Sequence, residues 1–392
     1  MQKIKDIIRR WIYRFIDEPN NPIIKRIDDL RVQILDAQKK MEQVILNSNK
    51  YGLICNNFLQ KYYTEKTGKN LSDHFVSYYY ESSAGFANLG DYIQTIATEK
   101  AIRRCVQKDG RNPIFENVLR SNLTEHQGGT CVMQGWFEHK QLTFLPGRNT
   151  RPVWIGTHFS HDAREMIKQL YATSEIRFTD IGCRDKSTMA FCQSLGMVSY
   201  FSRCLTLTFP RRSEADASKA TNVYIVDCPD IVIKHLPDKI KDGAIIMTQR
   251  NYRHAPWQDW KKNKEMAAQL LEEYHTKAKL IITTALHCAQ PCIAMGIPTV
   301  FINPEYDEAD RFSSMDGLIR QYSIEDIING EIEYPTEAPF YEDLKDAILR
   351  NLELSLKVHL TEKEEFERQN IREFIGNYNI IETHRIPPTN NL

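Results

Sequence analysis

Short apolar runs recur along most of the chain, and their spacing alternates between that of β-strands and that of α-helices. Between residues 75 and 208 the strand-like runs are Phe75–Glu81, Gly129–Trp136, Arg151–His158, Ile176–Ile181 and Val198–Thr208. The helical patterns between them are Tyr92–Val106, Arg164–Tyr171 and Lys186–Leu195. Strands that alternate with helices predict a parallel sheet with helices on both faces.

A second series of the same kind follows the polar segment Pro210–Lys219, which has the composition of a linker. Its predicted strands are 223–227, 244–248, 280–284 and 298–302, and its predicted helices are 257–274 and 286–295. Residues 280–304 contain no Asp, Glu, Lys or Arg, but threonines, His287, Gln290 and prolines interrupt this run. We therefore expect a buried strand, helix and strand there, and no transmembrane helix.

The first seventy residues follow a different pattern. Residues 4–16 place isoleucines, Trp11 and Phe15 on one helical face, whereas the other face, counted from Lys3, carries five basic residues and one acidic residue. This composition predicts a helix on an anionic membrane surface, through residues 1–18, with docking on the protein itself or on a second subunit as the alternative. Residues 27–44 carry an apolar heptad seam, which predicts either a homo-oligomer contact or a packing helix.

The length of 392 residues favours more than one domain. We predict an α/β fold with two Rossmann-like domains, residues 71–212 and 213–340, and a cleft between them. A helical N-terminal extension, residues 1–70, precedes them. C-terminal helices and a loose tail, residues 341–392, follow them.

Charge and cysteine content limit the kinds of partner and the cellular compartment that we expect. The 51 basic and 51 acidic residues cancel, which argues against a nucleic-acid partner. The cancellation is local, because residues 1–16 carry a net charge of +4 and residues 303–344 a net charge of −10. An anionic membrane or substrate is therefore not excluded. The nine cysteines form no Cys-x-x-Cys pair and lie mostly in apolar runs, so we expect reduced thiols, no metal site and a cytoplasmic protein.

Candidate chemistry lies where predicted strands end. Asn88, Gly90 and Asp91 stand between a strand and a helix. Gly90 permits a close approach of the backbone to a ligand, and Asn88 or Asp91 can cap a helix whose N–H groups suit an anion or a hydroxyl. A capped turn without a ligand is the alternative. The missing Gly-Lys-Ser/Thr sequence excludes a P-loop.

Two arginines stand in or after strand-like runs of the first series. Arg184 follows a predicted strand, where ligands bind in open α/β sheets, and its guanidinium can fork onto a carboxylate or phosphate. A structural pairing with Asp185 is the alternative. Arg203 stands in a mostly apolar run, so its charge needs a partner or a ligand.

Two histidines stand at corresponding places in the two series. His287 follows Thr284 at a strand end in the second series, and His158 ends a strand in the first. An imidazole suits proton transfer at neutral pH, and a core histidine is the alternative. Arg250 and Arg253 follow another strand of the second series and are candidates for anion contacts.

Taken in order, these segments resemble the polysaccharide pyruvyl transferase family. The matching text is Asn88–Asp91, Gln134–Trp136, Ile181–Asp185, Phe201–Thr208, Leu286–His287 and Ala294–Thr299. The resemblance spans roughly residues 75–325 and leaves residues 1–70 outside.

The resemblance implies a fold similar to the GT-B glycosyltransferases. It implies phosphoenolpyruvate as donor substrate, no further cofactor, and a pyruvate ketal formed on two hydroxyls of a cell-surface glycan or its lipid- or nucleotide-linked precursor. The protein would work in the cytoplasm, on the inner face of the plasma membrane if residues 1–18 bind it. On this basis His287 and His158 are expected to be catalytic, and the expected substrate-binding residues are Asn88, Gly90, Asp91, Arg184, Arg203, Arg250, Arg253, Thr284 and Arg311.

One position departs from the family pattern. Many members carry Arg two residues before the histidine, where this chain has Ala285. The loss of a charge-assisted contact costs about 1.5–3 kcal/mol in donor binding unless another arginine replaces it. Two alternatives follow: a GT-B-type glycosyltransferase that uses a nucleotide sugar, with the acidic cluster 305–310 near the nucleotide, and a family member without catalytic activity.

Overall fold

The computed structural model describes residues 73–80, 86–126, 128–137, 145–147, 150–172, 180–252, 259–304, 309–358 and 360–381, together with Gln33. Apart from Gln33, the predicted extension 1–70 lies outside these residues, and so does the predicted tail 385–392. The membrane and oligomer roles of the extension therefore stay predictions.

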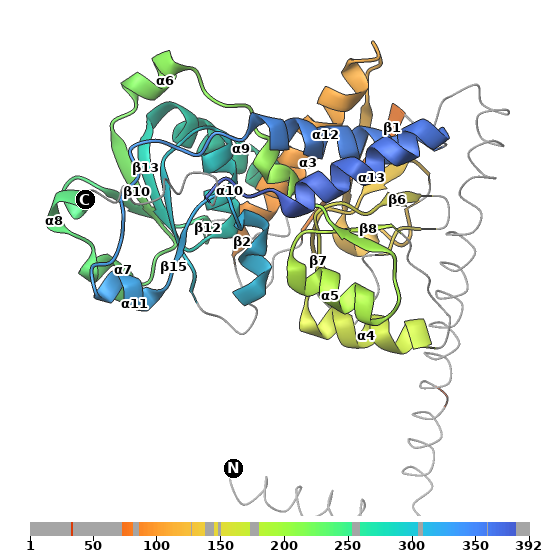
Figure 1. The fold of residues 1–392 in the computed structure, drawn as a ribbon, viewed down its shortest axis with the longest axis horizontal. Coiled ribbons are helices and arrows are strands. Elements are labelled where there is room, and N and C mark those ends of the chain that lie inside the picture. Colours follow the sequence, from red (N-terminus) through yellow and green to blue (C-terminus); the bar gives the residue numbers. More distant parts are fainter. Residues whose placement is uncertain are drawn as a thin grey trace, which may run out of the picture.

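The first half of the described chain contains two four-stranded parallel sheets (Figure 1). One has the order β3-β1-β4-β6, formed by Ile114–Leu119, His74–Tyr79, Thr130–Val132 and Arg151–Val153. The other has the order β5-β7-β8-β9, formed by Gly135–Phe137, Thr157–Phe159, Ile181–Cys183 and Ser199–Phe201. The helices of this half are α3 (Leu89–Gln107), α4 (His161–Ala172) and α5 (Lys186–Ser194), with the 3-10 turn η2 (Arg120–Asn122).

Two predicted strands were too long. The runs Gly129–Trp136 and Arg151–His158 each split into two strands that belong to different sheets. The breaks fall at glycines: Gly156 has φ of +70°, and a Cβ on Gly135 would stand 1.8 Å from the Tyr80 hydroxyl oxygen. Apolar residues continue through both breaks, so hydrophobic periodicity alone does not reveal them.

Other boundaries also moved. The predicted strand Val198–Thr208 ends at Phe201, since Arg203 adopts φ of +58° and Leu205–Thr208 form the 3-10 helix η4. Strand β8 begins at Ile181, where the predicted strand was to end. The predicted linker contains helix α6 (Glu214–Lys219), capped by the Ser213 side chain.

The second half contains a five-stranded parallel sheet of order β11-β10-β13-β14-β15. Its strands are Ile245–Met247, Asn222–Val226, Ala278–Thr283, Thr299–Ile302 and Gln321–Tyr322. The helices around it are α7 (Asp230–His235), α8 (Asp238–Lys241), α9 (Trp260–Lys277), α10 (Leu286–Ala294), α11 (Ile324–Ile328) and the 3-10 helix η5 (Ala309–Met315). The buried strand, helix and strand predicted between residues 280 and 302 are confirmed. Among the described residues, no helix is both long and apolar enough to cross a bilayer.

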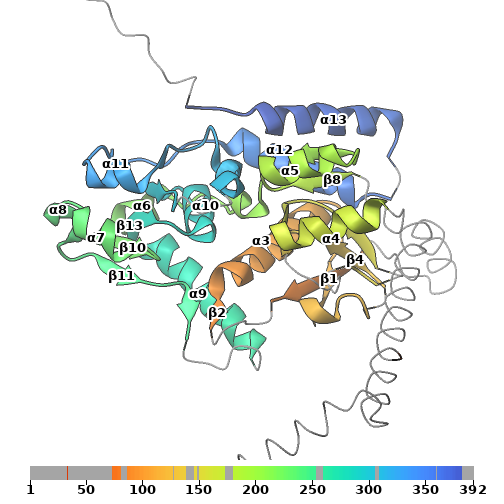
Figure 2. The ribbon, with the colours of Figure 1, turned by 90° about the horizontal axis from the view of Figure 1, so that it is seen from below.

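The two halves pack directly on each other. The short strand β2 (Ala87–Asn88) pairs antiparallel with β12 (Arg250–Asn251), and α3 lies against α9. The C-terminal helices α12 (Glu342–Leu356) and α13 (Glu362–Asn377) return to the first half, where α12 contacts α3 and α13 contacts β9 (Figure 2).

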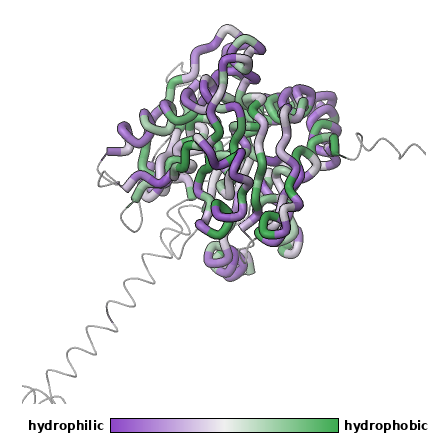
Figure 3. The backbone as a smooth tube through the Cα atoms, turned by 90° about the vertical axis from the view of Figure 1, so that its left-hand side faces the viewer, coloured by the Kyte–Doolittle hydropathy of each residue, from purple (hydrophilic) through white to green (hydrophobic). Residues whose placement is uncertain are grey.

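One apolar cluster extends through both halves, with members such as Phe75, Tyr224 and Leu349. Figure 3 shows hydrophobic and hydrophilic stretches alternating along the described backbone. The parallel sheets confirm an α/β fold. The domain boundaries remain predictions, and this shared core shows that the halves are not packed independently.

Candidate active site

The candidate site begins where the N-termini of two helices meet. Asn88 caps α3, its side chain accepting a hydrogen bond from the amide of Gly90 at 3.1 Å. Helix α10 begins at Leu286, so His287 lies in its first turn. Gly90 packs against this histidine, because a Cβ on Gly90 would stand 3.3 Å from the His287 Cβ. The structure therefore brings together Asn88, Gly90 and His287, which the sequence holds far apart.

His287 is held in its neutral form. Its Nε2 atom is buried and makes no hydrogen bond to the described residues. Burial lowers the pKa of His287 well below its usual value, and the positive charges of Arg184 and Arg311 and the neighbouring His158 lower it further. A neutral imidazole at physiological pH can accept a proton from a substrate hydroxyl.

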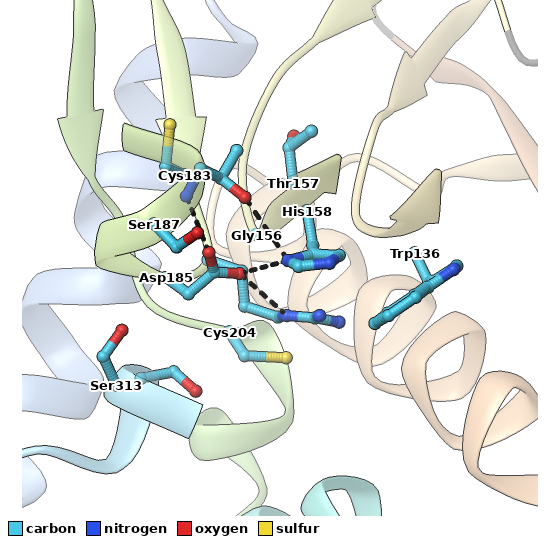
Figure 4. Close-up of polar contacts among 12 residues, drawn as sticks. Trp136, Gly156, Thr157, His158, Cys183, Asp185, Ser187, Cys204 and Ser313 are labelled. Atoms are coloured by element: carbon cyan, nitrogen blue, oxygen red, sulfur yellow. Dashed lines mark hydrogen bonds and ion pairs between the residues drawn. The ribbon is translucent and has the colours of Figure 1, made fainter. Parts of the chain in front are cut away.

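The junction between β8 and α5 places a carboxylate against a second histidine. Asp185 caps α5 by accepting the Thr188 amide at 2.8 Å, and its Oδ2 lies 2.6 Å from His158 Nδ1 (Figure 4). Burial on its own would raise the pKa of Asp185. His158, Arg184 and the Thr188 amide outweigh burial and hold that pKa below its usual value. Asp185 is therefore an ionised carboxylate with no exposed surface.

Arg184 is buried with few hydrogen-bond acceptors around it. Its side chain is 1% exposed. One of its terminal nitrogens lies 3.5 Å from Gln94 Oε1, and its Nε lies 3.7 Å from Asp185 Oδ2 without a hydrogen bond. A guanidinium has five N–H donors in a rigid fork that matches carboxylate and phosphate groups. This arrangement suits an anionic ligand that supplies the acceptors.

Trp136 lies next to His158 and two arginines. Its ring stacks on His158 at a centroid distance of 4.3 Å, and the guanidinium carbons of Arg311 and Arg184 lie 5.3 and 5.9 Å from its ring centroid. Arg120 donates to the Trp136 carbonyl at 2.8 Å, and the Tyr80 hydroxyl accepts from its amide at 3.0 Å. Trp136 is thus fixed by its backbone, and its ring lies beside both arginines.

The family comparison now adds to this geometry. The model of the polysaccharide pyruvyl transferase family matches residues 88–306, more than half of the 392-residue chain. The chain belongs to the polysaccharide pyruvyl transferase family. The matched range contains Asn88, Trp136, His158, Arg184 and His287, whereas Arg311 lies just beyond it. Family membership makes the protein a transferase at the level of its family.

Solved structures give weaker likenesses. An uncharacterised protein from Klebsiella pneumoniae subsp. pneumoniae is 13% identical, with a TM-score of 0.37, over 64% of this chain and 92% of that one. The lipopolysaccharide outer core galactosyltransferase WaaB in its apo form is 9% identical, with a TM-score of 0.29, over 77% of this chain and 99% of that one. At these scores neither likeness adds to the fold described above. Among proteins with curated descriptions, no match was found.

The position where many members of the pyruvyl transferase family carry arginine has a specific place in this structure. Ala285 is the N-cap residue of α10 and packs, half-buried, against the main apolar cluster. Positive charge nevertheless reaches His287, because Arg184 and Arg311 both act on it. Of Arg203, Arg250 and Arg311, the described arginines that could replace it, Arg311 is the one that lies beside Trp136 and lowers the pKa of His287.

Three other expected contacts lie at the edge of this site. Arg250 pairs with Asn88 in the antiparallel bridge, and its exposed guanidinium lies 5.2 Å from the Phe86 ring centroid. Asp91 accepts a hydrogen bond from Gln94 at 3.2 Å. The Thr284 hydroxyl donates to the Asp227 carbonyl at 2.6 Å, so it holds the strand end. Arg253 and residues 305–308 of the acidic cluster lie outside the described residues.

Arg203 has a different role from the one expected. Its guanidinium donates to four backbone carbonyls, those of Ser314, Asp316, Ile375 and Tyr378, at 2.9–3.2 Å. These bonds use most of its donors on the protein itself. The expectation of a substrate contact is therefore replaced by that of a structural tie.

Sequence reasoning assigned no role to Trp136, although it stands in a family segment, and it offered Asp185 only as a structural partner of Arg184. The structure places the two side chains of that pair 3.7 Å apart and adds His158 as a closer partner of Asp185. A signal for Trp136 was present, since the tryptophan follows directly on Gln134 and Gly135. Within the described residues, no group of three or more His, Cys, Asp or Glu side chains could hold a metal ion.

Proposed function

We propose that this protein transfers the enolpyruvyl group of phosphoenolpyruvate to a sugar of a cell-surface polysaccharide or its precursor and forms a pyruvate ketal. The observation that carries the proposal is the buried Arg184 guanidinium, short of acceptors, beside a neutral His287. Phosphoenolpyruvate offers both a phosphate and a carboxylate, the two groups that a guanidinium binds in bidentate fashion. Membership of the pyruvyl transferase family supports the same donor.

The reaction adds two hydroxyls to one carbon. In the first step a sugar hydroxyl attacks C2 of the donor, and its proton ends on the methylene carbon, which becomes a methyl group. In the second step the C2–O bond to phosphate breaks, and a second hydroxyl forms the ketal. The second hydroxyl proton leaves with inorganic phosphate, so the sum is donor plus diol to ketal plus phosphate.

The described residues divide these tasks. His287 Nε2 takes the proton of the attacking hydroxyl and passes it to the methylene carbon, which its neutral form allows. Arg184 and Arg311 hold the phosphate and carboxylate and stabilise the charge that develops on the departing phosphate. His158 has no exposed surface and is held between Asp185 and Trp136, so we assign it to positioning the site.

The acceptor edge is the start of α3. Asn88 is exposed and ends the strand that pairs with Arg250, and the half-buried Asp91 follows three residues later. Amide, carboxylate and guanidinium groups together can bind several sugar hydroxyls. A lipid- or nucleotide-linked precursor on the cytoplasmic side of the membrane is the acceptor that we propose.

The test is incubation of the full chain with phosphoenolpyruvate and extracted glycan precursors. We expect release of inorganic phosphate together with a product whose mass has risen by one pyruvyl ketal. His287→Gln serves as the matched enzyme control, since Gln retains polarity but cannot relay the proton. Consumption of a nucleotide sugar in place of phosphoenolpyruvate would support the glycosyltransferase alternative. Tight donor binding without turnover on any acceptor would support a non-catalytic member.

A further inference from the structure

Arg203 joins three segments that are distant in sequence. It stands two residues after the end of β9 in a left-handed backbone conformation, with φ of +58°, which is costly for a residue with a side chain. Its side chain is 1% exposed, and it donates to Ser314 and Asp316 at the end of η5 as well as to Ile375 and Tyr378 at the end of α13. The strained backbone and the four hydrogen bonds together fix one relative placement of these segments.

Helix η5 carries an arginine of the candidate site. Arg311 stands near its start, beside Trp136 and close enough to His287 to lower its pKa. The same short helix is held at two further points. The Ser313 hydroxyl accepts from the Lys186 amide at 2.8 Å, and the Ser314 hydroxyl accepts from Gln290 at 2.6 Å.

The chain after α13 closes the arrangement from the other side. The Ile380 amide donates to the Gly317 carbonyl at 2.9 Å. Gly317 has φ of +74°, and a Cβ there would stand 2.8 Å from the Asn379 Cα. The segment that follows η5 is therefore packed against the end of the C-terminal helix, with Arg203 beneath both.

We propose that Arg203 is a positioning residue that fixes η5 and, through it, sets Arg311 beside the donor site. The inference rests on the proposed function only for the choice of donor. Arg203 touches no substrate in this scheme. It acts at the end of the helix opposite Arg311, so its loss displaces that guanidinium rather than removing it.

The test compares two charge-preserving substitutions. Arg203→Lys keeps the positive charge but cannot span four carbonyls with a planar fork. The matched control is Arg372→Lys, because Arg372 ties α13 to Asp180, Asn351 and Ser355, and among the described residues none of its hydrogen bonds reaches η5. We expect Arg203→Lys to lower kcat/KM for phosphoenolpyruvate by about ten- to hundredfold. Arg372→Lys should lower the melting temperature by a similar amount to Arg203→Lys, but it should leave kcat/KM almost unchanged.

A second readout does not need turnover. The titration of His287, followed by NMR of histidine-labelled full chain and assigned with His287→Gln, reports the charges that face it, which are Arg184, Arg311 and His158. We expect Arg203→Lys to raise the His287 pKa towards its ordinary value, as Arg311→Gln does. In the Arg311→Gln background, Arg203→Lys should add little further shift.

The outcomes distinguish failure of the Arg203 inference from failure of the proposed function. If Arg203→Lys and Arg372→Lys shift the His287 titration equally, or if Arg203→Lys acts undiminished in the Arg311→Gln background, Arg203 is merely structural and the inference is wrong. If the wild-type chain never turns over phosphoenolpyruvate, the proposed function fails. The titration still decides whether Arg203 positions Arg311.

Discussion

Two buried arginines on neighbouring strands of one sheet have opposite surroundings. Arg184 follows β8 and Arg203 follows β9, and each side chain is 1% exposed. Arg203 donates to four backbone carbonyls of its own protein. Arg184 has one long hydrogen bond to Gln94, and its Nε lies 3.7 Å from Asp185 Oδ2 without a hydrogen bond. The donors of Arg203 are therefore bound by the protein itself, whereas Arg184 still has N–H donors available for a ligand.

This difference distinguishes a buried charge that stabilises the fold from a buried charge that binds a ligand. A buried cation is costly unless its donors are matched, so Arg203 can contribute to folding. Arg184 keeps part of that cost in the absence of an anion, which is the arrangement expected of a preorganised binding site. Burial alone does not distinguish the two, but the inventory of hydrogen bonds does.

The largest expected effect is on kcat, and it comes from a substitution of His287, the proton-transfer group near Arg184. His287→Gln should lower kcat by about 10²–10⁴-fold, because it removes a general acid–base group. Donor binding, measured by calorimetry with phosphoenolpyruvate, should change little. Retention of wild-type kcat with a normal melting temperature would contradict the assignment.

The same substitution has a pH signature in stability. The folded pKa of His287 lies well below that of the unfolded chain, so below pH 6.5 the unfolded state binds the proton more readily. This group therefore costs no stability above pH 6.5 and lowers stability progressively as pH falls below that value. Melting curves from pH 7.5 to 5 should fall less steeply for His287→Gln than for the wild type.

The next effect compares the two arginines directly. Arg184→Gln should weaken donor binding by about a hundredfold or more, because a buried charge contact is lost, yet change the free energy of unfolding by about 1 kcal/mol or less. Arg203→Gln should instead cost about 3–5 kcal/mol in stability, since it leaves several buried carbonyls without donors. Calorimetric donor binding and chemical denaturation of both variants check this. Equal stability losses would abolish the distinction between the regions.

The sequence predicted both arginines but could not separate them. Strand-end reasoning found Arg184, His287 and Asn88, because parallel strands bring their carboxyl ends to one edge. The acceptors of Arg203 come from residues 314–378, more than a hundred positions away, and no local pattern shows which carbonyls will meet it.

The fold was predictable to a similar extent. Helices α3, α5 and α10 and the strands β10, β11, β13 and β14 of the five-stranded sheet follow from periodicity and length, and their boundaries moved by only a few residues, whereas β15 was not predicted. The divisions at Gly135 and Gly156 did not follow, because a change of sheet depends on backbone conformation inside a continuous apolar run. The Arg203 conformation likewise ended a strand that its apolar neighbours would have continued.

A smaller effect on stability is expected from a substitution of Asp185, the carboxylate beside Arg184. Asp185→Asn keeps the side-chain oxygen that caps α5 but loses the charge facing His158, which should cost about 2–3 kcal/mol at pH 7. The folded pKa of Asp185 is lowered, so its stabilisation is present above about pH 3.9 and is lost as pH falls through that lower pKa. The difference in melting temperature between variant and wild type should therefore shrink below about pH 4.

The control for that prediction is a carboxylate at the same end of α5. Asp316 pairs with the exposed Lys186 at 2.7 Å, so Asp316→Asn should cost only about 0–1 kcal/mol. If both substitutions cost the same at pH 7, the Asp185–His158 pair contributes no more than a surface ion pair.

The smallest expected effect lies at the rim, where an exposed arginine belongs to neither region. Arg250 stacks over Phe86 and pairs with the strand that caps α3, so we place it at the acceptor edge. Arg250→Gln should raise KM for the glycan acceptor by about three- to fivefold and leave donor KM unchanged, because an exposed cationic contact is worth about 0.5–1 kcal/mol.

Arg320→Gln is the matched control, since Arg320 is also exposed and lies 4.7 Å from the Tyr322 ring centroid, in a contact outside the site. A rise in donor KM for Arg250→Gln would move Arg250 into the anion site with Arg184. Equal acceptor effects in both variants would show that the contact is one of general surface charge, and the acceptor edge would then rest on Asn88 and Asp91.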